Sequence, residues 1–428
     1  MSLPLASTLV ARTVEVPDLG DLISALPAAS LSQALTWVQR GDGLVAFGEV
    51  ARIRTHGERR FADADTAWQE LVAGAVVRDP VRLPGTGPIA FGSFSFSRHS
   101  TAGGVLIVPE VIIGRRDGVS WMTTVSTDAL PAPPDLWPGP APRLPSPRVQ
   151  FREGAQSASD WQRSIREVLT VIRSGAVGKV VMARDLVADL DSEPDARAVL
   201  GLLAQQYPSC WTFAVDAMIG ATPELLVRRE RGLLSSRVLA GTIQRTGDDA
   251  NDLARAGALA RSSKDLEEHE FAVDSLTDSL REFAASTSAP DTPYVLHLPN
   301  VMHLATDVTA VLAPEHAEMS SLAVAAALHP TAAVCGTPTL AAAQVIAEHE
   351  RMDRGRYAAP VGWMGADGDG EWGIALRSAA VLGSTKLRLF AGCGIVAASD
   401  PQAELAEAEA KFAPMRAALG SAPPGAPR

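Results

Sequence analysis

The sequence predicts an α+β fold, because segments with helical spacing and segments with strand composition occur without a regular alternation of strand and helix. Near the N-terminus, short apolar runs separated by glycines are typical of antiparallel strands, as in GDGLVAFGEVARI (41–53) and GPIAFGSFSFS (87–97). Farther along, apolar residues at helical spacing over 158–173 predict a helix, whereas GKVVMARDLVA (178–188) indicates a strand. A layered α+β domain fits this mixture better than a doubly wound parallel sheet.

The segment PELLVRRERGLLSSRVLAGT (223–242) has the composition of two strands joined by a turn. Arg231 and Gly232 lie at the centre of that turn, where glycine adopts the left-handed backbone most easily. The sequence contains no internal repeat. These features also favour an α+β domain.

A proline-rich segment, LPAPPDLWPGPAPRLPSP (130–147), divides the chain, because its prolines cannot continue a helix or a central strand. We predict that it connects an N-terminal part (1–129) to a C-terminal part (148–418) that carries the chemical motifs. The last residues, 419–428, are rich in proline and small side chains, and we predict that they are disordered.

The composition restricts the class of function. The 428 residues are 46% hydrophobic and can bury a large core. The net charge of -11 argues against a nucleic acid partner, which a basic surface normally binds, and a small anionic substrate would need a locally positive pocket. Three cysteines, Cys210, Cys335 and Cys393, have no paired spacing, so neither a disulfide framework nor a zinc site is indicated.

The N-terminal residues MSLPLASTLVARTVEV lack the basic start and the apolar run of a signal peptide. No stretch reaches the roughly 18 uninterrupted apolar residues of a membrane-spanning helix. Together with the cysteine pattern, these features predict a cytoplasmic protein that has no membrane partner.

Two segments predict acidic helices of similar geometry. The first extends over 251–283 and gathers its apolar residues on one stripe at about 100° per residue. The stripe contains Leu266, Val273, Leu276 and Leu280. Asp265, Glu268 and His269 lie along one edge of it, whereas Glu267 is on roughly the opposite side. We therefore predict that Glu268 faces a cleft and that Glu267 faces away from it.

The second helix is predicted to begin at Asp400 and Pro401, a favourable N-cap and first helical position. Its core stripe contains Leu405, Ala408, Phe412 and Met415. Glu404, Glu407 and Lys411 lie along the same edge that is acidic on the first helix. Magnesium prefers carboxylate oxygens, so two facing acidic edges could hold one ion. The alternative is a pair of solvated faces, because acidic helix faces are common.

Nine short strings follow one another in the second half of the chain. They are GKVVMAR (178–184), TPELLVR (222–228), VLAGT (238–242), SSKDLEEHE (262–270), HLATDV (303–308), LHPTAAVCGTP (328–338), ERMDRGRYAAPVGW (350–363), IALRSA (374–379) and AGCGIVAASDPQAELAEAEAKF (391–412). Together they resemble the chorismate-utilising enzymes, a family of isochorismate, salicylate, anthranilate and aminodeoxychorismate synthases. Each string alone is weak evidence, but nine in the family's order are highly specific.

The resemblance implies a single large α+β unit, in which two stacked antiparallel sheets have helices outside and an active site in a cleft. The string GDGLVAFGEVARI extends the likeness into the N-terminal part. The segments on the two sides of the proline-rich connector would therefore belong to one unit.

The resemblance also implies catalytic roles. Lys179 matches the lysine that activates water, and Glu224 matches the general acid. Lys179 shares its predicted strand face with Val177 and Val181, and an apolar setting would favour the neutral amine that a base requires. A lone lysine in a strand is otherwise most often an exposed edge residue, and Thr222-Pro223-Glu224 could instead begin a helix.

Magnesium is the implied cofactor, held principally by Glu268 and Glu404 with Asp265 and Glu407 beside them. The resemblance implies that the carboxylates of the substrate chorismate are held by Tyr357, Arg377 and Lys411. Further contacts to the substrate are implied for Gly241, Thr242, His303, Gly392 and Gly394. Individually, these could be ordinary surface or core residues. Their combination, and no single residue, favours the assignment.

Within the family, two positions favour water over ammonia as the nucleophile. Ammonia-using relatives generally carry glutamine where Lys179 stands, and aminodeoxychorismate synthases carry a lysine where this chain has Ala240. We therefore expect a monomeric isochorismate synthase without a glutamine amidotransferase subunit, in a menaquinone or siderophore pathway. A salicylate synthase, which goes on to eliminate pyruvate, and a catalytically silent relative that binds chorismate are the alternatives.

Two positions depart from the family pattern. Ala359 replaces the glycine of Tyr-Ala-Gly-Pro, and Leu405 replaces the tryptophan of a Glu-Trp pair in the last helix. A methyl group at Ala359 could obstruct a close approach of the backbone. Leu405 would remove packing beside a metal ligand.

Overall fold

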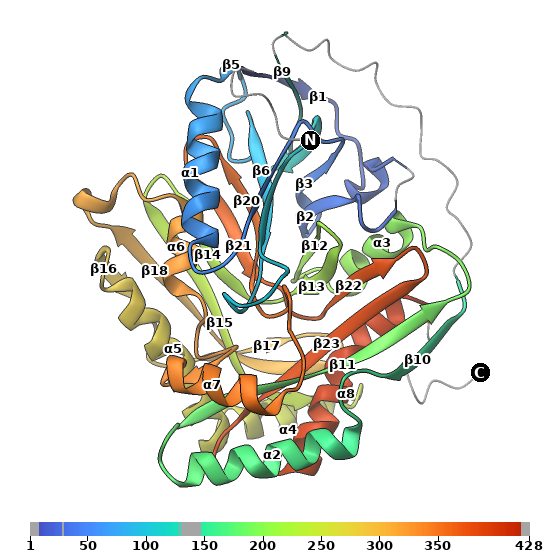
Figure 1. The fold of residues 1–428 in the computed structure, drawn as a ribbon, viewed down its shortest axis with the longest axis vertical. Helices are drawn as coiled ribbons and strands as arrows, with labels where there is room; N and C mark the ends of the chain where they lie inside the picture. Colours follow the sequence, from blue (N-terminus) through green and yellow to red (C-terminus); the bar gives the residue numbers. More distant parts are fainter. Residues whose placement is uncertain (1–7, 28–29, 128, 130–146, 421–428) are drawn as a thin grey trace.

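Two large β-sheets form the centre of the computed structural model, and helices lie outside them (Figure 1). The structure describes residues 8–27, 30–127, 129 and 147–420. The α+β class and the two antiparallel sheets expected from the sequence are confirmed. The proline-rich connector and the disordered tail were predicted for segments that mostly lie outside the described residues.

The larger sheet has thirteen strands among the described residues, and its neighbouring strands are antiparallel except for one parallel pair, β1 and β5. In spatial order the strands are β10 (Val149–Glu153), β11 (Lys179–Leu190), β23 (Lys386–Ile395), β22 (Ser378–Gly383), β13 (Met218–Thr222), β12 (Trp211–Val215), β2 (Leu35–Gln39), β3 (Asp42–Phe47), β8 (Val111–Arg116), β9 (Val119–Thr127), β1 (Leu9–Val16) and β5 (Val76–Arg78). The short strand β19 (Gly336–Thr337) also pairs with β11.

The smaller sheet has ten described strands, and they are all antiparallel to their neighbours. In spatial order the strands are β16 (Ala284–Ser288), β18 (Val301–Leu312), β15 (Leu233–Gln244), β14 (Leu225–Glu230), β21 (Gly370–Ile374), β20 (Pro360–Gly365), β6 (Ile89–Phe94), β7 (Gly104–Val108) and β4 (Ala51–Thr55). The strand β17 (Tyr294–His297) pairs with β18.

Both sheets contain strands from the two sides of the proline-rich segment. In the larger sheet β2 pairs with β12, so that Trp37 lies opposite Phe213. In the smaller sheet β6 pairs with β20, so that Ser93 lies opposite Val361. Each sheet is therefore continuous across segments that are far apart in the sequence.

The helices cover the outer faces of the sheets. They are α1 (Arg60–Ala73), α2 (Ala158–Arg173), α3 (Ala196–Gln206), α4 (Asp249–Leu259), α5 (Ser263–Leu280), α6 (Ser321–Leu328), α7 (Thr339–His349) and α8 (Pro401–Ala418), with short 3-10 turns at Ile23–Ala25 and Pro314–His316. Helices α1, α5 and α6 contact the smaller sheet, and α2, α3, α7 and α8 contact the larger one (Figure 1). In the described part of the chain, no helix combines the length and apolar character needed to cross a membrane.

Several predicted elements are confirmed at the level of single residues. Helix α2 has the predicted bounds, and β14 and β15 are joined at Arg231 and Gly232, which both have positive φ angles. Helix α8 begins at Pro401, and the Asp400 side chain accepts hydrogen bonds from two backbone N–H groups in its first turn. The local sequence therefore sets these boundaries through turn and capping chemistry.

The prediction of one long helix over 251–283 is wrong, because the segment forms two helices, α4 and α5. Ser262 has an extended backbone between them, and its hydroxyl accepts a hydrogen bond from the Asp265 N–H at 3.3 Å. A serine that caps a new helix in this way competes with continuation of the old one. The second helix then ends at Leu280, so Phe283 lies outside it.

Trp37 links the two sheets through the core. Its side chain is almost completely buried, and its indole N–H donates to the Glu371 carboxylate of β21 in the other sheet at 2.9 Å. Gly373, also in β21, leaves room for the ring, since a Cβ there would be 2.8 Å from Trp37 Cη2 and 3.0 Å from the Glu224 carbonyl oxygen. This contact packs β2 of the larger sheet against β21 of the smaller sheet, next to the Glu224 carbonyl oxygen.

We expect Gly373→Ala to destabilise the protein by about 1–3 kcal/mol, because the added methyl group would overlap buried atoms. Gly383→Ala is the matched control, since a Cβ at Gly383, in another strand, would meet no atom within 4 Å. Urea unfolding of both variants measures the difference. Equal stability of the two variants would contradict the packing described for Trp37.

Candidate active site

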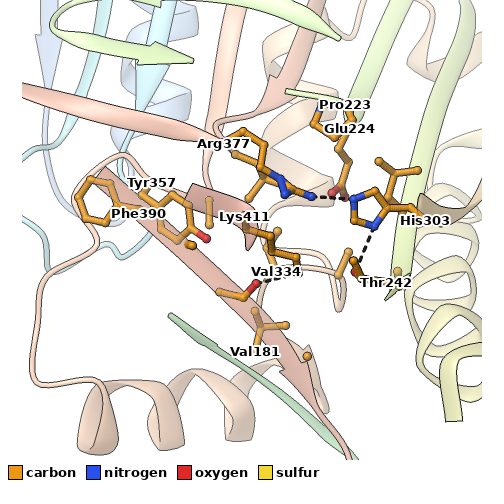
Figure 2. Close-up of a pocket in the computed structure, with 18 of the residues that line it drawn as sticks. Val181, Pro223, Glu224, Thr242, His303, Val334, Tyr357, Arg377, Phe390 and Lys411 are labelled. Carbon is orange, nitrogen blue, oxygen red and sulfur yellow. Dashed lines mark hydrogen bonds between the residues drawn. The ribbon is translucent and has the colours of Figure 1, made fainter. Parts of the chain in front are cut away.

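A cavity lies where strands of both sheets meet helix α5 and helix α8 (Figure 2). Most of the residues expected from the sequence to contact substrate or perform catalysis line it. They are Glu224, Gly241, Thr242, Glu268, His303, Tyr357, Arg377, Gly392, Gly394 and Lys411. The other four expected residues are Lys179, Asp265, Glu404 and Glu407, which do not line the cavity. The first two and Glu407 contact residues that line it, whereas Glu404 pairs with Lys264.

Lys179 is the first residue of β11, and its side chain is fully buried. It is therefore not the exposed edge residue that a lone strand lysine usually is. Its Nζ lies 3.3 Å from Glu268 Oε1. Gly394, on the neighbouring strand β23, permits this pairing, because a Cβ there would be 2.2 Å from Glu268 Oε1 and 2.8 Å from Lys179 Cε. The lysine is thus paired with a glutamate that lines the cavity.

Glu224 lies between β13 and β14, after Pro223, and only 4% of it is exposed. The strand continues at Leu225, so the segment does not begin a helix. Burial raises the pKa of Glu224 to about 8, although the charges of Lys179, Lys411 and Arg377 oppose the shift. The carboxyl group therefore holds its proton near neutral pH and can act as an acid.

His303 connects two walls of the cavity (Figure 2). Its Nε2 accepts a hydrogen bond from Arg377 Nη2 at 2.6 Å, because a guanidinium group can only donate. Its Nδ1 then carries the hydrogen and lies 3.2 Å from the Gly241 carbonyl oxygen and 3.1 Å from Thr242 Oγ1. Burial lowers the pKa of His303 well below its ordinary value, so the ring is neutral. The histidine holds the arginine in place.

Arg377 provides an open donor at the cavity. Its Nη1 is buried and has no hydrogen-bond partner among the described residues, and the side chain forms no ion pair there. Its backbone adopts a positive φ of 49°, which is uncommon for a residue other than glycine and is a form of strain found at functional sites. A buried guanidinium group with an open N–H is suited to bind an anion, a carboxylate above all.

Tyr357 and Lys411 lie close to this donor. The Tyr357 ring stacks on Phe390 with 5.0 Å between ring centroids, and burial raises the pKa of its hydroxyl to about 12. The hydroxyl therefore keeps its proton at neutral pH. Lys411 Nζ donates to the Gly392 carbonyl oxygen at 2.9 Å and pairs with Glu407 at 2.6 Å. These groups give the cavity a locally positive wall in an acidic protein.

The acidic edges of α5 and α8 meet beside the cavity, as their helical geometry predicts. Glu268 lines the cavity, whereas Glu267 is exposed. Glu404 is almost completely buried and pairs with Lys264 at 2.7 Å. Asp265 instead lies against Gly241, where a Cβ would be 3.0 Å from the Asp265 Cβ. Asp265 therefore contacts a residue that lines the cavity without lining the cavity itself.

The carboxylates of Glu404 and Glu407 fit a hard divalent cation. Their ligand atoms and Cys393 Sγ all lie within 4.8 Å of one another. Burial and the charge of Glu407 raise the pKa of Glu404. Burial would also raise the pKa of Glu407, but Lys411 outweighs it and lowers the value. A cation would relieve the repulsion between the two carboxylates.

Two residues at this site were not singled out from the sequence. Cys393 lies between Gly392 and Gly394 in β23, so its side chain points to the opposite face of the strand. Its thiol donates to the Glu404 carbonyl oxygen at 3.2 Å. The period of two in a strand could have placed it on the face that meets α8. Lys264 could have been noticed because a cation in the first turn of a helix is unfavourable.

The two departures from the family pattern leave the fold of the site intact. Ala359 is fully buried, and its carbonyl oxygen accepts a hydrogen bond from the Ala375 N–H at 2.9 Å. The positive φ of this segment belongs to Ala358, not to Ala359. Leu405 is half-buried and packs against the core. The extra methyl group and the missing tryptophan are both accommodated.

Several known proteins are similar to this chain over most of its length. The chain is 34% identical over 415 residues to the salicylate biosynthesis isochorismate synthase of Pseudomonas aeruginosa, covering 90% of this chain and 85% of that protein. It is 36% identical over 272 residues to isochorismate synthase DhbC of Bacillus subtilis, covering 61% and 68%. The solved structure of MenF, the menaquinone-specific isochorismate synthase from Escherichia coli, has a TM-score of 0.77 and 25% identity, with 97% of both chains covered.

The family resemblance seen in the nine sequence strings is confirmed by these matches. A profile of the family described as chorismate binding enzyme matches residues 6–129 and 140–420, which is most of the chain. The chain therefore belongs to the family of chorismate binding enzymes.

Proposed function

We propose that this protein is a magnesium-dependent isochorismate synthase, which converts chorismate to isochorismate for menaquinone or siderophore biosynthesis. The observation that carries the proposal is the pairing, in one cavity, of a buried cation with an open donor, Arg377, and a buried protonated carboxyl group, Glu224. The first can bind a carboxylate and the second can protonate a leaving group. Relatives named as isochorismate synthases support the same activity.

The substrate would be held through its carboxylates. Arg377 offers the open Nη1, while Tyr357 and Lys411 add a hydroxyl donor and a positive charge at the same wall. His303 supports this arrangement indirectly, because its Nε2 accepts a hydrogen bond from Arg377 Nη2 and so orients the guanidinium group. We assign substrate binding to the first three residues and positioning to His303.

The proposed reaction exchanges one hydroxyl group for another. Lys179 takes a proton from water as the water oxygen forms a bond to ring carbon 2. The ring double bonds shift, the bond between carbon 4 and its hydroxyl breaks, and Glu224 gives its proton to the departing hydroxyl. One water enters and one leaves, so substrate and product are isomers. When bound, magnesium offsets the negative charge of the ring carboxylate.

The metal would be held by Glu268, Glu404 and Glu407. Asp265 contributes by packing against Gly241 and therefore supports the first turn of α5. Carboxylate oxygens are the donors that magnesium prefers, and Glu404 is buried enough to hold an ion away from bulk water. A chelator should abolish activity, and added magnesium should restore it.

We expect Glu268→Gln to lower kcat/KM by roughly 100-fold or more, because the change removes a charge that faces both Lys179 and the proposed metal. Glu267→Gln is the matched control on the exposed side of the same helix, and its effect should stay within about twofold. Steady-state kinetics with chorismate and magnesium measure both. Equal losses at the two positions would contradict the metal site.

The pKa of Glu224 predicts the pH dependence. A general acid must be protonated, and burial raises the pKa of this group from 4.5 to about 8. Because Glu224 must be protonated to act, the rate is expected to fall as the pH rises through about 8. Glu224→Gln should lower kcat by roughly 10²-fold to 10⁴-fold and remove this alkaline limb. A wild-type rate that stays constant up to about pH 10 would refute the assignment.

A further inference from the structure

The four lysines of the chain are distributed unevenly. They are Lys179, Lys264, Lys386 and Lys411. Three of them lie at the acidic site formed by Glu268, Glu404 and Glu407. The fourth, Lys386, lies elsewhere, with its Nζ 3.9 Å from Asp189 Oδ1 and its side chain about half exposed. Lys179 and Lys411 have roles in the proposed reaction, but Lys264 has none. Its placement therefore needs another explanation.

Lys264 occupies a position that is unfavourable for its own helix. It is the second residue of α5, after the N-cap Ser262, where the positive end of the helix dipole repels a cation. Its Nζ nevertheless lies 2.7 Å from Glu404 Oε1. The Glu404 side chain is 2% exposed, whereas that of Lys264 is 30% exposed. The lysine therefore reaches from the edge of solvent to a buried carboxylate.

Three carboxylates act on this one ammonium group. Burial lowers the pKa of Lys264, but the charges of Glu404, Glu268 and Glu407 outweigh burial and raise it. The ammonium group therefore lies where the fields of all the proposed metal carboxylates converge. A lysine ammonium is a compact, hydrated charge on a flexible stem, so it can neutralise such a site and can also move away.

We propose that Lys264 is the resident counter-cation of the acidic site, which neutralises Glu404 in the metal-free protein and which a divalent metal ion must displace. This inference rests on the proposed function, which assigns magnesium to the same carboxylates. Lys264 then competes with the metal and weakens its binding. A lysine that only held the site in shape would have the opposite effect, because its loss would weaken metal binding.

The test is a calorimetric titration of the full chain with magnesium chloride. Lys264→Met keeps the length of the stem and removes the charge. Its Kd for magnesium should fall by roughly tenfold. The expected change is smaller than for a fully buried charge, because solvent screens the partly exposed Lys264. Arg261→Gln is the matched control, since it removes an exposed cation from the turn before α5 and should change the Kd by less than about twofold.

A second measurement uses the wild-type protein and does not depend on the folding of a variant. Brief acetylation with acetic anhydride, followed by mass spectrometry, reports how accessible each lysine is. Magnesium should increase the labelling of Lys264 several-fold and leave that of Lys386 unchanged. The exposed Lys386 is thus an internal control for reagent and ionic strength.

An unchanged or raised Kd in Lys264→Met, or labelling of Lys264 that magnesium does not increase, would overturn the inference while leaving the metal site in place. No binding of magnesium to the wild-type protein would instead refute the metal site itself, and the inference with it. The two failures are therefore distinguishable.

Discussion

The pairing of three lysines with three glutamates in one crowded region is the constraint on which the site depends. The pairs are Lys179 with Glu268, Lys264 with Glu404, and Lys411 with Glu407. Burying a charge is costly unless a partner neutralises it, so removal of one member leaves the other uncompensated. The pairs join β11, α5 and α8, which are far apart in the sequence. Electrostatics and the fold are therefore coupled at this point.

Of the cations that line the cavity, Lys411 pairs with Glu407 and Arg354 pairs with Glu350, whereas Arg377 has no ion pair among the described residues. Its open Nη1 favours an anion, and neutral His303 holds it without cancelling its charge. Glu224 differs from the paired glutamates because the structure gives its carboxyl group no ion pair among the described residues, and burial keeps it protonated. The same side chain is thus an acid in one environment and a charged partner in another.

The helix start and the helix faces at the site could be predicted from local chemistry, whereas the catalytic and substrate-binding residues were expected from the family resemblance. Neighbouring residues alone determine that a helix starts at Asp400 and Pro401. They also determine that Glu268 and Glu267 lie on different faces of their helix. The break at Ser262 was not predicted, although Ser262 and Asp265 have the spacing that marks the start of a helix, because the apolar stripe on its own fits one continuous helix. Contacts between distant elements, such as the hydrogen bond from Trp37 to Glu371, have no local signature.

The most direct test of the proposed reaction follows the oxygen atom of water. Chorismate is incubated with the protein and magnesium in H₂¹⁸O, and the products are separated and their masses are determined by mass spectrometry. The account predicts that the wild-type protein forms isochorismate with one ¹⁸O atom. The Lys179→Ala variant should form no isochorismate, although it should still bind chorismate. Unlabelled isochorismate, or labelled isochorismate from Lys179→Ala at near the wild-type rate, would contradict the account.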